Sequence, residues 1–405
     1  MPARARWMRA LPMRTIYFVA GEVSADNHGA SLMRCLRELD PTLKFIGRGG
    51  PQMQEVAGKQ FKNWIGDAAV LGLWEVLRKY GYFREQFRQT TEEIVETEPD
   101  AVLLIDYPGF NLRLARALRR QSRRQKIIYY ISPQVWAWNP GRIKRMARWI
   151  DLVLCIFPFE ADLYNESGLR ALFVGHPMIE RLQVRKAEVA RDPNLIGLFP
   201  GSRLREVRKI LPVLIETARL LLRSKPTLRF EVAAASEELA QEIMMLTPHL
   251  NCLPPVTSGA PRTRPIFEIM VGKTAEIMQR AWVGIVASGS ATLEAAYFRM
   301  PFALVYKVAW PTYLAARLVV NVNYLGMPNL LAGREVVPEF IQHRAQPDAI
   351  ANAVRPLIDD EKARNQMISQ FDVVIPKLGG SGASEKAARA IIEEIGIPSS
   401  AVITR

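Results

Sequence analysis

The sequence contains few residues of the kinds that build disulfide frameworks or metal sites. Its 405 residues include three cysteines, Cys35, Cys155 and Cys252, and four histidines that are far apart. An odd number of scattered cysteines in apolar surroundings excludes a disulfide framework and is typical of a protein kept in a reducing compartment. No two aspartates are separated by a single residue, so a D-x-D pattern for a divalent cation is missing too.

Long apolar runs are also missing. No uninterrupted apolar stretch reaches about 18 residues, so the sequence predicts no membrane-spanning helix. The first residues, MPARARWMRALP, are basic and lack the apolar core of a signal peptide. Because Met13 directly precedes the first predicted strand, this segment is an extension or a misassigned start. The sequence does not decide between Met1 and Met13.

Two common nucleotide-binding motifs do not occur. No G-x-G-x-x-G follows the first predicted strand, and GRGGP (Gly47 to Pro51) matches that motif poorly. The stretch VGKT (Val271 to Thr274) has Phe267 where a P-loop needs its first glycine. The absence of both motifs argues against a dinucleotide-dependent dehydrogenase and against a P-loop nucleotidase.

Positive charge, in contrast, is abundant. The chain has 54 Lys and Arg residues against 40 Asp and Glu residues, a net charge of +14. Such an excess favours anionic partners: nucleic acid, phosphorylated small molecules or an anionic membrane surface. Basic runs lie at 118–126 and 141–149, where a solvated helix face is the alternative. A nucleic-acid-binding protein needs stacking aromatics between such runs or a known module. Neither is present, so we expect no nucleic-acid partner.

Strand and helix patterns alternate through most of the chain. Short β-branched or apolar runs, such as 15–20 and 101–105, are each followed by helical spacing. This rhythm predicts an α/β protein with parallel, doubly wound sheets, and it restarts after a polar linker. We predict two Rossmann-like domains that face an interdomain cleft, residues 13–190 and 191–375, and a C-terminal helical tail, residues 376–405.

One predicted buried strand ends in a charge. The stretch AVLLIDYPGFN begins at Ala101, and its apolar run ends at Asp106, directly before Pro108 and Gly109. Open α/β proteins place their chemistry at the carboxyl ends of parallel strands. Asp106 is therefore a candidate catalytic carboxylate, and bracing of the turn is the alternative. Glu22 follows the first strand similarly, either as a second acid or substrate-binding group, or as an ordinary loop carboxylate.

Two strand-to-helix loops in the second half have the composition of phosphate cradles. Small residues let the backbone approach an anion, and free N–H groups at a helix start point at it. A neighbouring arginine adds a forked donor array. A glutamate on the next helix either accepts hydrogen bonds from ribose hydroxyls or is an ordinary first-turn carboxylate. The candidate nucleotide-binding residues are Gly201, Ser202, Arg203, Ser288, Gly289, Ser290 and Glu294.

Eight motifs give the chain a family resemblance. In order, they are VAGEVSADNHGA, LLIDYPGFN, YYISPQVWAW, DLVLCIFPFE, FVGHP, LFPGSR, ASGSATLEAA and MPNLLAGREVVPE. The chain resembles the lipid-A-disaccharide synthase family from about Thr15 to beyond Phe371. The resemblance implies the GT-B glycosyltransferase fold and transfer, with inversion, of 2,3-diacylglucosamine from UDP. The implied acceptor is the 6-hydroxyl of 2,3-diacylglucosamine 1-phosphate (lipid X), and the products are a β-1,6-linked disaccharide 1-phosphate and UDP.

The implied reaction needs a base for the acceptor hydroxyl and charge stabilisation for the leaving diphosphate. We assign the base to Asp106 and keep Glu22 as a second catalytic candidate. We expect no metal and no other cofactor, so Arg203 and the N–H groups of the 288–290 loop have to neutralise the diphosphate. Three further candidates for substrate contacts are His28, Asn329 and Arg334. For the last two, a purely structural loop is the alternative.

The segment from Ala68 to Phe87 has apolar residues at helical spacing and basic residues near its end. Such a helix suits an anionic headgroup layer, and packing on the sheet is the alternative. The candidate membrane or acyl-chain contacts are Val70, Leu71, Leu73, Trp74, Val76 and Leu77. Together with the implied lipid substrates, this predicts a cytoplasmic protein bound peripherally to the inner face of the inner membrane. The sequence leaves a homo-oligomer open.

The nearest rival function is another UDP-N-acetylglucosamine-type enzyme, either a different GT-B transferase or an epimerase. Transfer requires an acceptor and epimerisation does not, so an assay with the sugar nucleotide alone separates the two. A nucleotide-dependent structural protein is a third class, and it predicts UDP binding without turnover.

Overall fold

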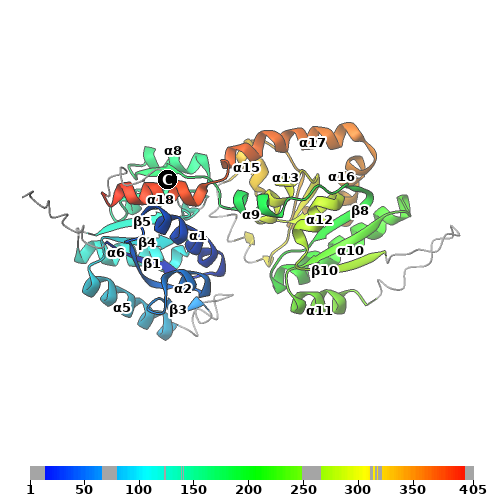
Figure 1. Cartoon of the computed structure of the whole chain (residues 1–405). Helices are drawn as coiled ribbons and strands as arrows, with labels where there is room; N and C mark the ends of the chain where they lie inside the picture. The colour runs from blue at the N-terminus through cyan, green and yellow to red at the C-terminus, as the bar shows by residue number, and fades with distance from the viewer. Residues whose placement is uncertain are drawn as a thin grey trace, which may run out of the picture. The chain divides into compact units, whose positions relative to one another are not determined.

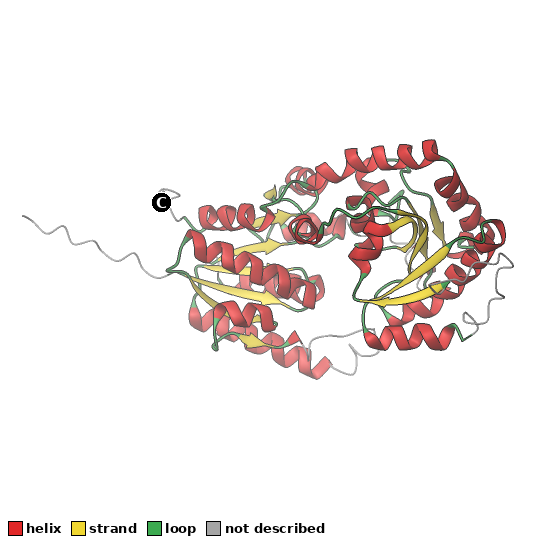
Figure 2. Cartoon of the chain, turned by 45° about the vertical axis from the view of Figure 1, so that its right-hand side comes forward, coloured by secondary structure: helices red, strands yellow, loops and turns green. Residues whose placement is uncertain are grey.

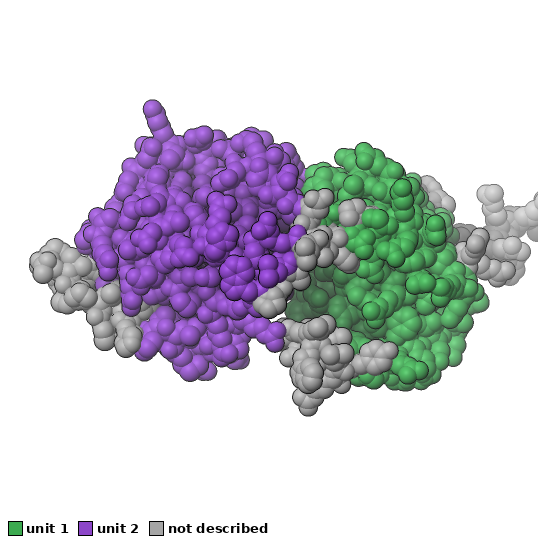
Figure 3. Space-filling view, turned by 180° about the vertical axis from the view of Figure 1, so that it is seen from behind, with its two compact units in different colours: residues 1–177, 380–405 green, residues 178–379 purple. Residues whose placement is uncertain are grey.

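The computed structural model describes residues 14–65, 80–122, 125–137, 139, 141–248, 266–310, 313–314, 317 and 322–396. The chain forms two compact units (Figure 3). Unit 1 consists of residues 1–177 and 380–405, and unit 2 of residues 178–379. In each unit, helices cover both faces of a parallel sheet (Figure 2), which confirms the predicted α/β class.

The described part of unit 1 has a seven-stranded sheet in the order β3-β2-β1-β4-β5-β6-β7. Its strands are β1 (Thr15–Ala20), β2 (Lys44–Gly49), β3 (Lys62–Asn63), β4 (Ala101–Ile105), β5 (Lys126–Tyr130), β6 (Leu152–Cys155) and β7 (Ala171–Phe173). Its helices are α1 (Val23–Leu39), α2 (Pro51–Ala57), α5 (Tyr80–Thr97), α6 (Pro108–Gln121), η1 (Val135–Ala137), α7 (Gly141–Met146), α8 (Pro158–Glu166) and α18 (Ala383–Glu394) (Figure 1).

The described part of unit 2 has a six-stranded sheet in the order β10-β9-β8-β11-β12-β13. Its strands are β8 (Asp192–Phe199), β9 (Arg229–Ala234), β10 (Phe267–Val271), β11 (Ala281–Ala287), β12 (Phe302–Tyr306) and β13 (Glu339–Ile341). Its helices are α9 (Met178–Arg185), α10 (Leu204–Ser224), α11 (Glu237–Leu246), α12 (Thr274–Arg280), α13 (Ala291–Tyr297), α15 (Met327–Ala332), η3 (Gln342–Arg344), α16 (Pro347–Asp359), α17 (Glu361–Val374) and η4 (Ile375–Leu378).

The apolar runs become central strands because helices bury both of their faces. All five residues of β4 are buried, and so are five of the six residues of β1. The flanking helices supply apolar stripes at three- and four-residue spacing, for example Leu32 and Leu36 of α1 and Leu114 and Leu118 of α6. Periodicity in the sequence therefore carries enough information to locate these elements.

The units divide at different residues from those predicted. The segment after Pro177 belongs to unit 2 instead of extending unit 1 to residue 190. Gln279 of α12 fixes it, because its amide donates to Arg185 O at 3.0 Å and accepts from Ala187 N at 2.7 Å. These hydrogen bonds tie the polar linker to the second sheet's helices.

The C-terminal helix is part of unit 1, although its packing partner could not be predicted from the sequence. Helix α18 packs along α1 and buries Ala387, Ala388 and Ile391. At its end, Glu394 forms ion pairs with Lys126 of β5 and with Arg170, which precedes β7. The expected separate tail at 376–405 is thus divided, with its start in unit 2 and its helix in unit 1.

Both sheets contain a topological switch point, where the strand order reverses. Strand β1 lies between β2 and β4, with Ala20 opposite Ile105. Strand β8 lies between β9 and β11, with Phe199 opposite Val286. Open doubly wound sheets bind ligands outside the carboxyl ends of strands at such points. The loops after β1, β4, β8 and β11 are therefore where the fold favours a functional site.

Candidate active site

The switch point of unit 1 brings Glu22 and Asp106 together. Glu22 follows β1 as the exposed N-cap of α1, and Asp106 directly follows β4 and is partly buried. Burial, with a smaller contribution from the charge of Glu22, raises the pKa of the Asp106 carboxyl from 3.8 to about 6. A hydrogen bond with the Tyr107 backbone opposes the rise. A carboxylate with this pKa is ionised at neutral pH and still basic enough to take a proton.

The backbone of Asp106 and Tyr107 is left-handed at both residues, with φ values of 47° and 49°. Residues other than glycine, asparagine and aspartate disfavour this conformation, so most of the strain lies at Tyr107. Three hydrogen bonds hold it: Tyr129 Oη donates to Asp106 O at 2.5 Å, Asn111 Nδ2 donates to the same oxygen at 2.8 Å, and Asp106 N donates to Tyr130 O at 3.1 Å. Strain maintained by buried partners is a frequent property of active sites.

The position of the Tyr107 ring explains why residue 21 in the motif VAGE is a glycine. A Cβ atom on Gly21 would lie 2.4 Å from Tyr107 Cδ1, so only glycine allows the ring to cover this point. Tyr107 also stacks on Phe110 and meets the edge of Trp64. Trp64 Nε1 in turn donates to Ala20 O at 2.6 Å. The exit of β1 and the turn after β4 are thus locked together.

A second carboxylate near this edge, Asp26, has a structural role. Its side chain is 2% exposed and accepts hydrogen bonds from the N–H groups of Gly50, Gln52 and Met53 at 2.9, 3.0 and 2.9 Å. These groups form the N-terminus of α2, where a carboxylate also favours the helix dipole. Asp26 therefore fixes α2 against α1.

A buried glutamate organises the SPQVWAW motif. Glu160 of α8 accepts hydrogen bonds from Ser132 Oγ at 2.6 Å and from Trp136 Nε1 at 2.9 Å. Burial raises the pKa of Glu160 to about 7, although these hydrogen bonds lower it. Tyr164 Oη adds a bond to Pro133 O at 2.6 Å. The motif is therefore a braced loop, and Trp138 lies outside the described residues.

Sequence reasoning did not identify a buried arginine in β2. Arg48 is 1% exposed and donates to Glu93 at 2.8 Å and to Gln86 Oε1 at 2.6 Å. Tyr17 Oη donates to Glu93 at 2.6 Å, and Lys62 pairs with the same carboxylate. These partners lower the pKa of Glu93 although its burial acts in the opposite direction. The network attaches α5 to the sheet, and no pattern in the sequence indicates it, because its members lie on separate elements.

The switch point of unit 2 gathers the first predicted phosphate loop. Gly201 has a φ of 113°, which favours glycine, and Ser202 and Arg203 are exposed beside it. Arg203 is the N-cap of α10, and its guanidinium donates to Glu206 at 3.0 Å. Tyr306, at the end of β12, is close enough for the charges of Glu206 and Arg203 to affect its pKa, although burial is the main cause of its raised value. Tyr306 is a site residue that the sequence did not reveal.

The second predicted phosphate loop follows β11. Ser288 N donates to Val305 O at 3.0 Å, which keeps this residue in the sheet, and Gly289 and Ser290 are exposed. Gly289 has a φ of 144°, and a Cβ atom placed on it meets nothing within 4 Å. The loop therefore has an open approach for a ligand.

Glu294 lies in the first turn of α13, as expected. It is already paired in the structure, since Arg181 of α9 donates to its Oε1 atom at 2.6 Å. Its side chain is 14% exposed. A ribose hydroxyl that binds Glu294 therefore shares its carboxylate with Arg181.

Asn329 corrects one expectation. We expected a substrate contact, but Asn329 is fully buried and its amide is satisfied within the protein. Its Nδ2 donates to Val337 O and to Glu339, both at 2.8 Å, and its Oδ1 accepts from Val336 N and Val337 N at 2.6 and 2.8 Å. An amide has four such positions, so none is left for a sugar or phosphate. Asn329 holds the PNLLAGRE loop in shape.

The other two substrate candidates lie on different units. Arg334 is exposed after α15 in unit 2 and donates to Gln370 of α17 at 2.8 Å. His28 lies on α1 in unit 1 and is partly buried. The structure therefore brings Asp106 and Glu22 together in unit 1, and it brings the two phosphate loops together in unit 2.

The six predicted membrane contacts, Val70, Leu71, Leu73, Trp74, Val76 and Leu77, lie outside the described residues. In the part of the chain that is described, no helix has the length and apolar character needed to cross a bilayer. Within the same residues, no three side chains of His, Cys, Asp or Glu gather as a metal-binding group would.

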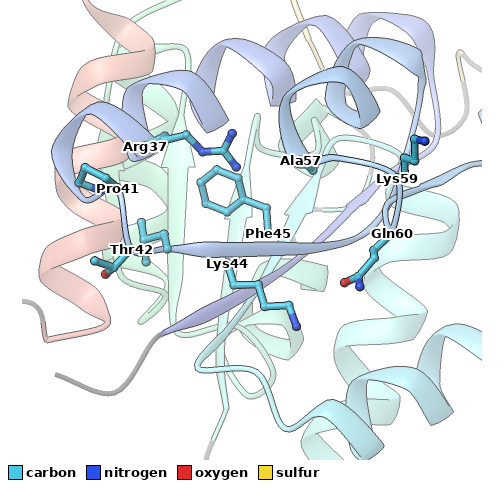
Figure 4. Close-up of a pocket in the computed structure, with 9 residues that line it drawn as sticks. Arg37, Pro41, Thr42, Lys44, Phe45, Ala57, Lys59 and Gln60 are labelled. Carbon is cyan, nitrogen blue, oxygen red and sulfur yellow. The ribbon is translucent and has the colours of Figure 1, made fainter. Parts of the chain in front are cut away.

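A pocket of about 500 Å³ in unit 1 lies at the other edge of the sheet (Figure 4). Residues 41–45, which lead into β2, form one wall, and Ala57, Lys59 and Gln60 form another. The guanidinium of Arg37 lies over the Phe45 ring, 5.1 Å from its centroid, and donates to Val56 O. This pocket is at the amino-terminal end of β2, so it is separate from the turn that carries Asp106.

The sequence has clear relatives. Residues 16–391 match the protein family described as lipid-A-disaccharide synthetase. The chain is 38% identical over 389 residues to the lipid-A-disaccharide synthase of Geobacter sulfurreducens, covering 94% of this chain and 97% of that protein. It is 32% identical over 392 residues to the enzyme of the same name from Persephonella marina, covering 94% and 99%.

Solved structures share the fold at low identity. A putative UDP-N-acetylglucosamine 2-epimerase from Listeria monocytogenes aligns with a TM-score of 0.61 and 10% identity over 96% of this chain and 97% of its own. The calicheamicin glycosyltransferase CalG4 aligns with a TM-score of 0.53 and 11% identity over 95% and 100%. With two parallel-sheet domains and relatives along nearly its whole length, the chain belongs to the lipid-A-disaccharide synthase family of glycosyltransferases and has the GT-B fold.

Proposed function

We infer that the chain transfers 2,3-diacylglucosamine from UDP to the 6-hydroxyl of 2,3-diacylglucosamine 1-phosphate, with Asp106 as the general base. The observation that carries this assignment is the Asp106 turn. It presents a carboxylate with a pKa of about 6 at the switch point of unit 1, on a strained and hydrogen-bonded backbone. A base is most effective when its pKa is near the working pH.

In the proposed reaction, the Asp106 carboxylate takes the proton of the acceptor 6-hydroxyl. The oxygen then attacks the anomeric carbon of the donor from the face opposite UDP, the bond from that carbon to the diphosphate breaks, and the configuration inverts. Glu22 lies at the neighbouring strand end, and its negative charge keeps Asp106 basic. That role supports Glu22 as an auxiliary group of the acceptor site.

Donor binding is assigned to the two loops of unit 2. Positive charge on Arg203 and N–H groups at the start of α13 suit a diphosphate, and they would stabilise the charge that develops as UDP leaves. Glu294 is the candidate partner of the ribose hydroxyls. This assignment uses no metal ion, and metal independence is itself a prediction.

Both substrates are lipids in this proposal, so the enzyme has to work at an anionic membrane surface. The net charge of +14 and the amphipathic pattern of the Ala68–Phe87 segment support peripheral attachment to the cytoplasmic face of the inner membrane.

The test is turnover by the purified full-length chain in mixed detergent–lipid micelles. We expect UDP release and disaccharide formation only when both UDP-2,3-diacylglucosamine and the acceptor phosphate are present, and we expect the rate to persist in EDTA. Consumption or isomerisation of a sugar nucleotide without acceptor would favour an epimerase. Loss of turnover in EDTA that Mg²⁺ restores would contradict the metal-free assignment.

A further inference from the structure

Unit 2 contains a second basic site, away from its nucleotide loops. A pocket of about 390 Å³ is lined by the linker after α9, the end of α13 and one face of α17. Arg191 directly precedes β8, and Arg299 lies between α13 and β12, so the pocket is at the amino-terminal edge of the sheet. The nucleotide loops follow the carboxyl ends of the strands, roughly 25 Å away along the eight residues of β8.

Positive charge dominates this pocket. The described residues that line it include four cations, Lys186, Arg191, Arg299 and Arg364. No Asp or Glu is among the described lining residues. Burial and the charges of Arg364 and Arg299 together lower the pKa of Arg191 to about 10. Arg364 and Arg299 are therefore each close enough to Arg191 to repel it.

Nearby carboxylates compensate this charge only in part. Asp372 accepts a hydrogen bond from Arg299 at 3.0 Å, in an exposed ion pair. The charge of Glu361 acts on Arg364. Four cations thus share the pocket while two carboxylates interact with them from outside it. An anion inside the pocket would relieve the remaining repulsion.

The walls of the pocket are fixed before any ligand arrives. Arg191 donates to Met278 O at 2.9 Å, to Ala281 O at 2.5 Å and to Phe298 O. Arg364 stacks on Trp282 with its guanidinium carbon 3.6 Å from the ring centroid. These contacts hold the positive charges of Arg191 and Arg364 in place before binding, so their side chains lose little entropy when an anion binds.

The backbone at Arg299 adds an independent observation. Its φ is 55°, directly after α13, where glycine or asparagine is the usual residue. An arginine therefore occupies a position whose backbone favours a small residue. Its side chain lines the pocket, which supplies a reason for the exception.

We propose that this pocket binds a small phosphorylated molecule at a site distinct from the donor nucleotide site. Guanidinium groups match phosphate oxygens in pairs, and a multiply charged phosphate suits several arginines better than a single carboxylate does. The site lies within unit 2, at the edge of its sheet opposite the nucleotide loops. Its ligand is therefore an effector and not a substrate.

The experiment is a titration of the full chain with inorganic pyrophosphate by isothermal calorimetry, in excess UDP and at constant ionic strength. We expect saturable 1:1 binding that UDP does not displace. The double variant Lys186→Gln, Arg299→Asn removes two cations and leaves Arg191 in place. Asparagine tolerates the left-handed backbone, and we expect the affinity to fall by about tenfold or more.

The control is Arg219→Gln, which removes an arginine that pairs with Glu216 on α10, away from the pocket. We expect it to bind pyrophosphate like the parent. Equal affinity in the parent and the double variant would overturn the proposal, and so would displacement by UDP. An equal loss in the control would mean that only overall charge matters, and would overturn it as well.

Discussion

At the scale of single residues, Asp106 combines three properties that oppose folding: a left-handed backbone, a buried carboxylate and a neighbouring negative charge. Each costs on the order of 1–3 kcal/mol. Tyr129, Asn111 and the covered Gly21 offset these costs by fixing the turn. A protein under no functional pressure would lose such a combination, so we expect it to serve the reaction.

The first prediction concerns the rate. Asp106→Asn keeps the shape of the side chain and removes the base, so kcat should fall on the order of 10²-fold or more. Because the donor loops are in unit 2, the affinity for UDP should stay within about twofold of the parent. In the parent, kcat/KM should fall below a pH of about 6, as Asp106 becomes protonated. Wild-type turnover in the variant would remove Asp106 from the chemistry.

The same substitution predicts a gain in stability. A carboxyl whose pKa rises on folding contributes stability below its unfolded pKa of 3.8, and that contribution is lost as the pH rises through about 6. The loss is roughly 3 kcal/mol at most. Asp106→Asn should therefore unfold at higher urea concentration than the parent at pH 8, with a smaller difference at pH 4. If the variant and the parent differ in urea midpoint by the same amount at pH 4 and at pH 8, the burial of this charge is contradicted.

Single polar residues show where sequence reasoning succeeds and where it fails. Asp106 was identifiable because a buried run ends directly before it. Asn329 was assigned to substrate because its loop looked functional, but its partners are the N–H groups of Val336 and Val337, whose need for an acceptor no pattern records. Arg48 was missed because its partners on α5 lie 38 and 45 residues away.

At the scale of elements, short helices depend on their caps. Helix α2 has seven residues, too few to be stable alone, and Asp26 accepts hydrogen bonds from two of its N–H groups and from that of its N-cap, Gly50. Strands and helices themselves were well predicted, since β1 and β4 have the bounds of their apolar runs. The cap was not predicted, because it joins residues more than twenty positions apart.

The second prediction tests this cap. Asp26→Ala should lower the free energy of unfolding by about 1–3 kcal/mol, measured in urea, while the folded fraction keeps the parent kcat. The control Asp40→Ala removes a half-buried carboxylate that accepts hydrogen bonds from Thr42 in the same turn, and should have little effect. Parent stability combined with lost turnover would instead assign Asp26 to the chemistry.

The third prediction concerns the donor loops. Arg203→Ala and Glu294→Ala should each weaken UDP binding by about tenfold, measured by calorimetry. Arg181→Ala is the matched control, because it breaks the ion pair with Glu294 but leaves the carboxylate for the ribose. Unchanged UDP affinity in both loop variants would refute the donor site. An equal loss in Arg181→Ala would mean that the ion pair, and not a ribose contact, supports binding.

At the scale of the whole molecule, the number of domains follows from the restart of the alternating pattern, whereas their boundaries do not. A sequence pattern is local, and α18 joins unit 1 through ion pairs of Glu394 with residues more than 200 positions away. The linker belongs to unit 2 for a similar reason, through Gln279. Boundaries set by such distant contacts become visible only in three dimensions.

The last prediction concerns attachment to the membrane. Basic residues near the end of the Ala68–Phe87 segment include Arg84, which is exposed, whereas Arg88 of α5 is paired with Glu85 and Glu92. The pairing of Arg88 reduces its attraction for an anionic surface, so the test targets the apolar side chains of the segment. Changing Leu71, Trp74 and Val76 to serine should reduce sedimentation with anionic vesicles and raise the apparent KM for the lipid acceptor.

The matched control changes three exposed apolar side chains of unit 2, Val184, Met245 and Val373, to serine. It removes three exposed apolar side chains from the described surface, so it should bind vesicles and lipid acceptor like the parent. Circular dichroism separates the remaining outcomes. A folded triple variant that still sediments with vesicles would refute the membrane role of this segment. An unfolded one would show that Leu71, Trp74 and Val76 pack in the core, because serine at buried positions removes apolar contacts that folding needs.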